Sequence, residues 1–388
     1  MTDTATFTFS TVPHLVSESG AVRKLGDLVS GRFPSARRAL LVTDPGFLRT
    51  GLLEAPITSM EQAGIHVHVY SDVIADPPEH VVLAAVDAAR RFDCDIVIGF
   101  GGGSSMDVAK LIAVLAPSEQ QINQIYGIGN VKGARLPLVQ IPTTAGTGSE
   151  VTNISIVTTG ATTKMGVVAP QLYADMSILD ATLTLGLPPA ITAATGIDAM
   201  VHAIEAYTSK HKKNPMSDSL ARQALALLSA NLITATQNGS DLIARQAMLL
   251  GACLAGQAFS NAPVAAVHAL AYPIGGIFHV PHGLSNSLVL PHVMRFNMPD
   301  AAVQYAELAA IVVPNAGGSV EAQAEALIAA MQQIATISNI ETQLSQVGIK
   351  ATDLDRLADD AMLQTRLLGN NPREVTRADA RAIYAAAF

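Results

Sequence analysis

The segment Asp95-Ile-Val-Ile-Gly-Phe-Gly-Gly-Gly-Ser-Ser-Met-Asp107 decides the fold of the chain. Its first residues form a short apolar run, which predicts a buried strand over residues 95–100. Three glycines follow, and residues 107–115 then have a helical pattern. Glycine allows a phosphate to approach the backbone, and a helix N-terminus presents free N–H groups and the positive end of its dipole. The strand, turn and helix together favour phosphate binding.

The glycine turn differs from the common nucleotide motifs in two respects. Ser104 stands where the third glycine of G-x-G-x-x-G would lie, and the P-loop pattern G-x-x-x-x-G-K-[ST] does not occur in the sequence. A kinase or ATPase therefore lacks its main support. Ser104 and Asp107 also satisfy the S-x-x-[DE] capping pattern, so a plain glycine turn before a capped helix is the alternative interpretation.

Strand and helix patterns alternate on both sides of this segment. Such alternation predicts a parallel α/β sheet, in which ligands bind beyond the carboxyl ends of the strands. The patterns predict strands at residues 39–44, 66–70, 136–141 and 178–180, helices before Ala63 and at residues 81–92, a hairpin at residues 151–165 and a possible edge strand at residues 6–9.

Polar residues follow two of these predicted strands. The carboxylate of Asp44 can accept the ribose hydroxyls of NAD and repel the additional phosphate of NADP, although a turn residue before Pro45-Gly46 is the alternative. Thr143, Thr144 and Thr147 offer hydroxyl and N–H groups to a ligand, or form Ser/Thr turns. We therefore expect a nucleotide cofactor at this edge of the sheet.

The pattern changes after Leu187-Pro188-Pro189. Strand patterns nearly disappear, and long Ala- and Leu-rich helical patterns continue towards the end of the chain. We expect two domains, an α/β dinucleotide-binding domain over residues 1–187 and an all-helical metal-binding and substrate domain over residues 188–388. The helices of the second domain are predicted at residues 218–236, 241–259, 301–312 and 320–338.

The helical half contains a candidate metal site. Asp198 and His202 are four residues apart in a stretch of helical composition, so they share one helix face. A second segment supplies His268 and His282 beside Gly and Pro turns. One carboxylate and three imidazoles suit Fe(II), Zn(II), Mn(II) or Co(II), and an open substrate position beside four protein ligands favours Fe(II). The alternatives are that each histidine is only packed or exposed, or that His279 competes as a ligand.

Composition and charge limit the class of protein. The net charge of -8 over 388 residues, with one dense basic run at residues 210–213, argues against nucleic-acid binding. Two cysteines, Cys94 and Cys253, make neither a disulfide framework nor a Cys-x-x-Cys zinc motif, which fits a reducing compartment. The N-terminus lacks a signal-peptide pattern, and the apolar tracts carry polar residues at helical spacing. We therefore expect a soluble cytoplasmic protein without a membrane partner.

A divalent metal beside a nicotinamide makes a workable dehydrogenase. The cation lowers the pKa of an alcohol hydroxyl and stabilises the alkoxide from which hydride leaves. NAD carries the redox chemistry, and the protein positions C4 of the nicotinamide against the carbinol carbon. The sequence therefore suggests hydride transfer between NAD and a metal-bound small primary alcohol, or the reverse reaction with the aldehyde.

The chain resembles the iron-containing (group III) alcohol dehydrogenases in four motifs that occur in family order, at residues 101–107, 142–150, 195–205 and 268–282. The resemblance extends from about residue 7 to Asn371-Pro372-Arg373. It implies a dehydroquinate synthase-like fold, with an N-terminal parallel α/β nucleotide domain and a C-terminal all-α metal-binding domain. It also implies NAD(P)-linked interconversion of alcohols and aldehydes, often by a homodimer.

The resemblance also implies roles for particular residues. It matches the metal ligands, with Fe(II) as the expected ion and Zn(II) or another divalent metal as the alternative, to Asp198, His202, His268 and His282. It places Asn153 near the substrate, and it associates Asp44 with preference for NAD. The positions expected to bind the cofactor are Asp44, Gly102, Gly103, Ser104, Asp107, Thr143, Thr144, Thr147 and Lys164.

One position departs from the family pattern. Many members have a second histidine four residues after the third ligand, and here that position is Tyr272. A phenol with a pKa of ~10 is a poor base at neutral pH, so Tyr272 leaves the proton route and the substrate preference open. The surrounding sequence resembles the hydroxyacid–oxoacid transhydrogenase branch, which makes such a transhydrogenase, or a hydroxyacid or semialdehyde dehydrogenase, the alternative function. A lyase like dehydroquinate synthase fits the motifs less well, and the complete ligand set argues against a non-catalytic protein.

Overall fold

The computed structural model describes residues 6–160 and 163–388. These residues form two compact units. The first, which we call the sheet unit, comprises Thr11–Thr144 and Gly148–Leu185. The second, the helical unit, comprises Gly186–Phe388 together with residues 6–10 and Ala145–Thr147.

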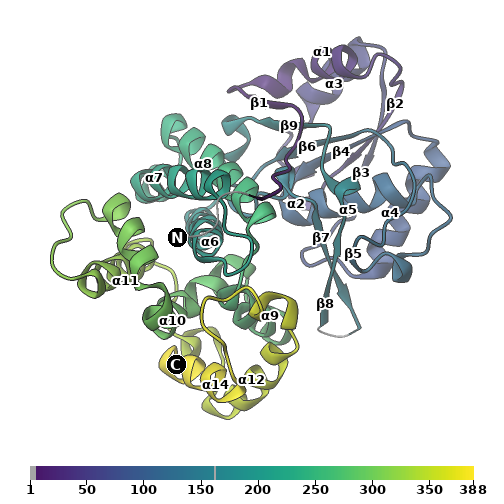
Figure 1. The fold of residues 1–388 in the computed structure, drawn as a ribbon. Coiled ribbons are helices and arrows are strands. Elements are labelled where there is room, and N and C mark those ends of the chain that lie inside the picture. The colour runs from purple at the N-terminus through teal and green to yellow at the C-terminus, as the bar shows by residue number, and fades with distance from the viewer. Residues whose placement is uncertain (1–5, 161–162) are drawn as a thin grey trace. The chain divides into compact units, whose positions relative to one another are not determined.

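The sheet unit is built on six parallel strands in the order β1-β9-β6-β4-β2-β3 (Figure 1). The central strands β4 and β6 are buried at every position, as expected for a parallel sheet with helices on both faces. The strands are β1 (Leu15–Ser17), β2 (Arg38–Val42), β3 (His66–Tyr70), β4 (Ile96–Gly101), β6 (Leu138–Pro142) and β9 (Met176–Leu179). The main helices are α1 (Leu25–Arg32), α3 (Glu54–Gln62), α4 (Glu79–Phe92) and α5 (Gly103–Leu115).

The predicted strands and the predicted hairpin are confirmed, but the possible edge strand at residues 6–9 is wrong. The hairpin consists of β7 (Ile154–Thr159) and β8 (Thr163–Val168), which pair antiparallel. The edge strands of the main sheet are β1, which pairs with β9, and β3, which pairs with β2. Residues 6–10 belong instead to the helical unit, where the side chain of Asn261 donates to the Ser10 carbonyl and accepts from the Ser10 N–H.

The predicted capping box before α5 is also wrong. The helix begins at Gly103, and its N-cap is Gly102, which has no side chain with which to cap. The side chains of Ser104 and Asp107 therefore do not cap the N–H groups at the start of α5, and a ligand can accept from them.

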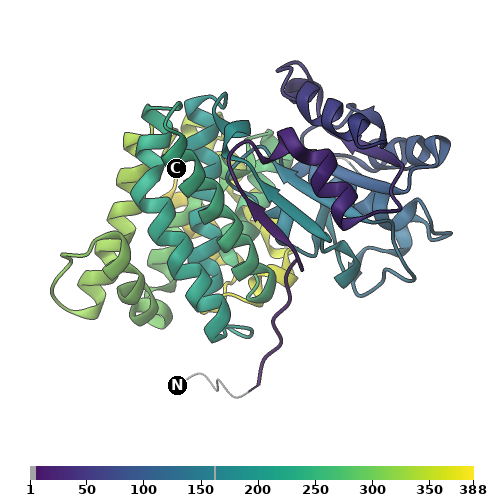
Figure 2. The same ribbon diagram turned by 90° about the horizontal axis from the view of Figure 1, so that it is seen from above.

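The helical unit packs its helices around α6 (Pro189–Thr208), most of which is buried. Figure 2 shows the helices of this unit from a second direction. Close approach depends on two glycines. A Cβ on Gly196 would lie 2.4 Å from a methyl carbon of Leu232, and a Cβ on Gly283 would lie 2.2 Å from the Ala194 carbonyl oxygen. The other helices are α7 (Pro215–Gln237), α8 (Leu242–Asn261), α9 (Ala266–Phe278), α10 (His282–Val312), α11 (Val320–Ile337), α12 (Leu354–Met362), α13 (Thr365–Leu368) and α14 (Arg377–Ala386).

The helix predicted at residues 301–312 is the last third of a much longer one. Helix α10 has 31 residues and contains Pro291 and Pro299. Proline lacks an N–H and normally interrupts a helix, so the sequence indicated only the part that follows both prolines. Packing of α10 against α6, α9 and α11 keeps the helix continuous.

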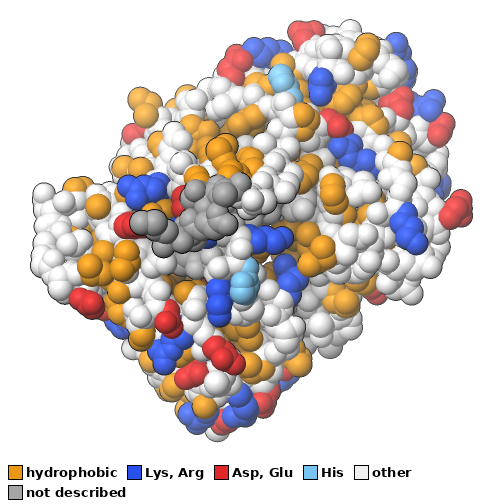
Figure 3. Space-filling view, in the orientation of Figure 1, with side chains coloured by type: hydrophobic (Ala, Val, Ile, Leu, Met, Phe, Trp, Pro, Cys, Tyr) orange, Lys and Arg blue, Asp and Glu red, His pale blue; other side chains and the backbone are white. Residues whose placement is uncertain are grey.

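One helix in the described part of the chain, α8, has the length and the apolar composition of a membrane span. Its apolar window is 67% buried inside the helical unit. Core helices of soluble proteins pass the same test, so α8 is weak evidence for a membrane. Acidic and basic side chains are interspersed on the face drawn in Figure 3, in keeping with the scattered charges of the sequence.

Candidate metal centre

Helix α6 presents three chemically active side chains along one face. Asp198, His202 and Glu205 are separated by four and three residues, which is the spacing of neighbours on one side of a helix. All three are buried, with exposed fractions of 1%, 4% and 4%. A carboxylate is rarely buried without partners, so this face must meet complementary groups.

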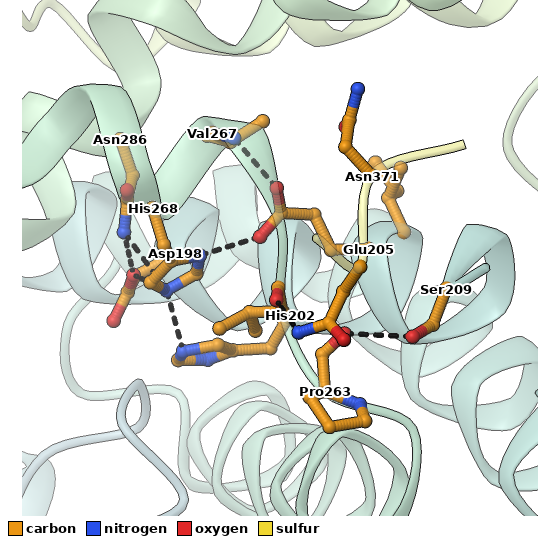
Figure 4. A network of polar contacts seen from close by, with 12 residues as sticks. Asp198, His202, Glu205, Ser209, Pro263, Val267, His268, Asn286 and Asn371 are labelled. Atoms are coloured by element: carbon orange, nitrogen blue, oxygen red, sulfur yellow. Dashed lines mark hydrogen bonds and ion pairs between the residues drawn. The ribbon is translucent and has the colours of Figure 1, made fainter. Parts of the chain in front are cut away.

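Those groups come from α9, which carries the His268 shown in Figure 4, and from the start of α10. His268 lies in the first turn of α9, and His282 is the first residue of α10. Asp198 Oδ1 is 3.9 Å from His268 Nε2 and 3.7 Å from His282 Nε2. These three ligand atoms all lie within 4.8 Å of one another. Ligand atoms at ~2.1 Å from a common ion would be roughly 3–4 Å apart, so the spacing suits a single cation.

His202 lies outside this group of three but contacts it. Its Nε2 is 3.0 Å from His268 Nε2, and its ring stacks on Phe259 at a centroid distance of 4.3 Å. Burial lowers the pKa of His202 to about 3, so the ring is neutral at physiological pH. A neutral imidazole is the form that coordinates a metal.

The described structure gives Glu205 a role that the sequence did not predict. Its Oε2 accepts from His268 Nδ1 at 2.6 Å, and its Oε1 accepts from the Val267 N–H at 2.7 Å. The proton of a neutral His268 is thereby held on Nδ1, which leaves the Nε2 lone pair directed at the cluster. Carboxylates commonly orient metal-binding histidines in this way. The spacing from His202 was a usable signal, but the partners of Glu205 lie more than 60 residues away.

Asn286 is the second residue that the sequence did not predict. It is fully buried, and its Nδ2 lies 2.6 Å from Asp198 Oδ1. The same nitrogen lies 3.3 Å from His268 Nε2 and 3.3 Å from His282 Nε2. Asn286 follows His282 by one helical turn, which was the available signal.

The residues of this cluster fit a divalent cation. Acceptor atoms of Asp198, His268 and His282 converge, and the first two belong to buried side chains, where unpaired lone pairs are costly, while His282 is partly exposed. Burial alone would raise the pKa of the Asp198 carboxyl, but the three neighbouring histidines and Asn286 hold that pKa below its ordinary value. A carboxylate with neutral imidazoles favours a first-row transition ion over calcium, which prefers oxygen ligands.

Two other residues of the same segment, Tyr272 and His279, occupy different positions on α9. Tyr272 lies one turn after His268 in α9, and its ring centroid is 6.0 Å from that of His282. His279 is the C-cap of α9, with φ 56°, and is exposed. It is not part of the group formed by Asp198, His268 and His282.

The sheet unit brings the predicted nucleotide residues together at the carboxyl edge of β2, β4 and β6. These strands are adjacent, and Gly101 pairs with Pro142. The Thr143 N–H donates to the Gly101 carbonyl at 3.0 Å. A Cβ on Gly102 would lie 3.8 Å from the hydroxyl of Thr144. The N-terminus of α5 begins at Gly103, beside this edge.

Two acidic residues near this edge differ in how their oxygens are used. Asp44 is the N-cap of α2 (Pro45–Leu48), and its Oδ1 accepts from the Phe47 N–H at 2.9 Å. Asp107 is held inside the unit, because its Oδ1 accepts from Ser149 Oγ at 2.6 Å and its Oδ2 accepts from the Ile156 N–H at 2.9 Å. The buried Lys110 ammonium also contacts Asp107 and donates to Ser149.

The remaining predicted residues lie on other segments. Lys164 is in β8 and pairs with Asp76 at 2.6 Å. Asn153 precedes β7, and its carbonyl accepts from the Ala169 N–H. Thr147 belongs to Ala145–Thr147, which is part of the helical unit.

A parallel sheet with a glycine-rich strand end and a helical unit with a buried carboxylate–histidine cluster define a metal-dependent enzyme linked to a nucleotide. Comparison with known proteins supports this class. The chain matches the iron-containing alcohol dehydrogenase family over residues 13–181, and the C-terminal region of the same family over residues 192–388. The chain belongs to this family of NAD-dependent, iron-binding oxidoreductases of alcohols and aldehydes.

Individual relatives agree with the assignment. Long-chain-alcohol dehydrogenase 1 of Geobacillus thermodenitrificans (strain NG80-2) is 43% identical over 91% of this chain and 90% of its own. The crystal structure of a 1,3-propanediol oxidoreductase superposes with a TM-score of 0.95 at 35% identity, covering 99% of this chain and 100% of the other. Sulfoacetaldehyde reductase of Bifidobacterium kashiwanohense, solved in complex with NAD+, has a TM-score of 0.87 at 28% identity, with 98% of each chain covered. The predicted family, fold class and reaction class are confirmed.

Proposed function

We propose that the protein interconverts a small primary alcohol and its aldehyde, with hydride passing between the carbinol carbon and C4 of the nicotinamide of NAD. Asp198, His202, His268 and His282 are the proposed metal ligands. When bound, a divalent cation supplies the Lewis acidity that lowers the pKa of an alcohol hydroxyl. The observation that carries the proposal is the convergence of acceptor atoms from two buried side chains, on α6 and α9, and one partly exposed side chain, on α10.

Three groups prepare this ligand set. The Glu205 carboxylate holds the proton of His268 on Nδ1, so that Nε2 faces the cluster. Burial keeps the His202 ring neutral. The pKa of Asp198, held below its ordinary value by the histidines and Asn286, keeps the carboxylate charged. A charged Asp198 carboxylate and a neutral His202 ring can bind a cation without first releasing a proton.

The sheet unit is proposed to hold NAD at the carboxyl edge of its sheet. The backbone of Gly102, Gly103 and Ser104 and the free N–H groups of α5 would receive the pyrophosphate. Asp44 would accept the ribose hydroxyls, since only its Oδ1 is engaged in capping α2. Asp107 would support α5 indirectly, because both of its carboxylate oxygens accept hydrogen bonds from Ser149 and Ile156. Further contacts with the cofactor are proposed for Thr143, Thr144, Thr147 and Lys164.

Tyr272 and Asn153 are the proposed substrate-contacting residues. The Tyr272 ring centroid lies 6.0 Å from that of His282, and this proximity to a proposed ligand supports a role in contacting the substrate. The proposed division of labour assigns the nucleotide to residues 1–187 and the metal and substrate to residues 188–388. A cytoplasmic homodimer completes the proposal, supported by the absence of a disulfide framework and by the low content of charged residues.

The test is to purify the protein without chelators, determine its metal content, and follow NADH with short primary alcohols, diols and hydroxyacids. The reverse direction uses aldehydes, semialdehydes and oxoacids. We expect metal-dependent turnover that is lost in Asp198→Ala. Metal-loaded protein that is inactive with every substrate in both directions would contradict the proposal. Hydride exchange between a hydroxyacid and an oxoacid without added NAD would instead establish a transhydrogenase.

A further inference from the structure

Asn286 occupies the meeting point of the proposed ligand set (Figure 4). Its Nδ2 contacts Asp198 Oδ1 at 2.6 Å and the Nε2 atoms of His268 and His282 at 3.3 Å each. It therefore touches one ligand from each of the three helices α6, α9 and α10. Its own position is fixed by packing, because Gly283 allows the first turn of α10 to press against the backbone of Ala194 in α6.

The donors and acceptors at this point can be assigned. His268 donates its Nδ1 proton to Glu205, so its Nε2 is an acceptor. The charged carboxylate of Asp198 accepts as well. An amide nitrogen carries two hydrogens, and these are shared among three nearby acceptors. Asn286 therefore holds the three acceptors around one point before a cation binds, so less side-chain freedom is lost on binding.

The amide oxygen of Asn286 gives a second indication. Within the described part of the chain, this oxygen is buried and has no hydrogen-bond partner. Buried amide oxygens are usually satisfied, and exceptions often mark functional positions. The contacts of Nδ2 therefore determine the orientation of the Asn286 side chain, because Oδ1 forms no hydrogen bond in this orientation.

We propose that Asn286 is a positioning residue that organises the metal-free ligand set. Its amide holds the Asp198 carboxylate in place and keeps His268 and His282 directed at a common point. This inference rests on the proposed assignment of Asp198, His268 and His282 as metal ligands. It adds that affinity for the metal depends on a neutral side chain that donates two hydrogen bonds.

The test measures metal affinity rather than turnover alone. Apo protein is titrated with Co(II) in competition with a chromophoric chelator, and the visible d–d spectrum of bound Co(II) is recorded. For Asn286→Ala we expect Co(II) affinity to fall about 10–100-fold, as is typical when a group that orients metal ligands is removed, together with a changed spectrum. Asn286→Ser, which retains one donor, should recover part of the affinity.

Asn297→Ala is the matched control. Asn297 is another buried asparagine of α10, and its side chain pairs with Asn371 rather than with the ligand set. This variant should lower thermal stability while leaving Co(II) affinity and spectrum unchanged. Should Asn286→Ala fail to fold, Asn286→Ser provides the same comparison.

Metal binding by the variants and by the wild type distinguishes the role of Asn286 from the assignment of the metal ligands. Wild-type affinity and an unaltered Co(II) spectrum in the Asn286 variants would overturn the role of Asn286 and leave the metal site intact. Wild-type protein that binds neither Co(II) nor Fe(II) would overturn the metal assignment itself.

Discussion

The Glu205 carboxylate and the His268 imidazole are joined by a hydrogen bond of 2.6 Å between Oε2 and Nδ1. The two residues lie on α6 and α9, and both are buried. The carboxylate also accepts from the Val267 N–H, so it holds both the backbone and the side chain at the start of α9. The orientation of His268 is therefore imposed by the neighbouring helix.

Replacing Glu205 with glutamine should weaken metal binding more than folding. Glutamine retains an acceptor for one of the two donors but removes the charge that orients the His268 ring. We expect about a 10–100-fold loss of metal affinity, measured by chelator competition. Glu341→Gln, at an exposed position, is the control and should bind like the wild type. Equal affinities in the two variants would show that Glu205 only supports packing.

The histidines of the α9 segment should differ sharply in their effect on metal content. His268→Ala should lose the bound metal on purification, because it removes the group that contacts Asp198, His202 and Asn286. His279→Asn should keep its metal, because His279 is exposed and asparagine tolerates its positive φ. Elemental analysis of the two purified variants measures their metal content and tests this difference. Loss of metal from His279→Asn would identify a different ligand set.

Asp44 should determine the preference for NAD over NADP. Asparagine at position 44 keeps an oxygen to cap α2 but removes the charge that would repel the additional phosphate of NADP. Since like charges in contact cost several kcal/mol, kcat/KM with NADP should rise by about tenfold or more. Asp44→Ala should show the same change in preference with an additional loss of about 0.5–2 kcal/mol of stability, because the cap is lost. An unchanged NADP/NAD ratio in both variants would exclude Asp44 from ribose recognition.

Two glycines around the predicted phosphate turn should respond differently to alanine. A Cβ on Gly99 would lie 2.0 Å from Gln140 Oε1 and 2.9 Å from Ala109 Cβ, so Gly99→Ala should destabilise the protein by about 1–3 kcal/mol. A Cβ on Gly102 has its nearest neighbours at 3.8 Å, so Gly102→Ala should fold normally. Its methyl group would instead obstruct the cofactor and raise the KM for NAD. Denaturant unfolding and steady-state kinetics separate the two effects.

Cys94 should resist alkylation in the folded protein. Burial and, to a smaller extent, the neighbouring Asp95 raise the pKa of the Cys94 thiol to about 11. At pH 8 the thiolate fraction is then about a thousandth, and iodoacetamide should label Cys94 only after unfolding. Because the folded pKa is raised, the unfolded chain loses this proton first, and stability falls as the pH rises from about 9 towards 11. Cys94→Ala should show a smaller loss of melting temperature over this range, and an identical loss would contradict the shift.

The sheet could be predicted because a strand buried on both faces leaves an uninterrupted apolar run. Residues 96–101 show this pattern, and β4 lies there, buried at every position. Residues 66–70 alternate histidine with valine instead, and β3 lies there as a partly exposed strand at the edge of the sheet. The edge strand β1 could not be predicted, because its three residues are partly exposed and have no such run. The length of α10 was equally hidden, since tertiary packing rather than local preference keeps the helix intact at its prolines.

The candidate site was predictable to the extent that its residues share short spacings. Asp198 and His202 have the spacing of one helix face, and Tyr272 follows His268 by one turn. Glu205 and Asn286 also have this spacing, but their chemical roles depend on partners contributed by other helices. A sequence shows neighbours along one helix, whereas it does not show which faces of different helices meet.

Only His279, Val280 and Pro281 separate α9 from α10, and each of these helices begins with a proposed ligand within its first turn. A cation held by His268 and His282, and by Asp198 on α6, would close a loop of the chain as a disulfide does. The chain has no disulfide among its two cysteines. Removal of the cation by a chelator would then open this loop. The exposed His279 lies between the two helices and is where a protease would cleave first.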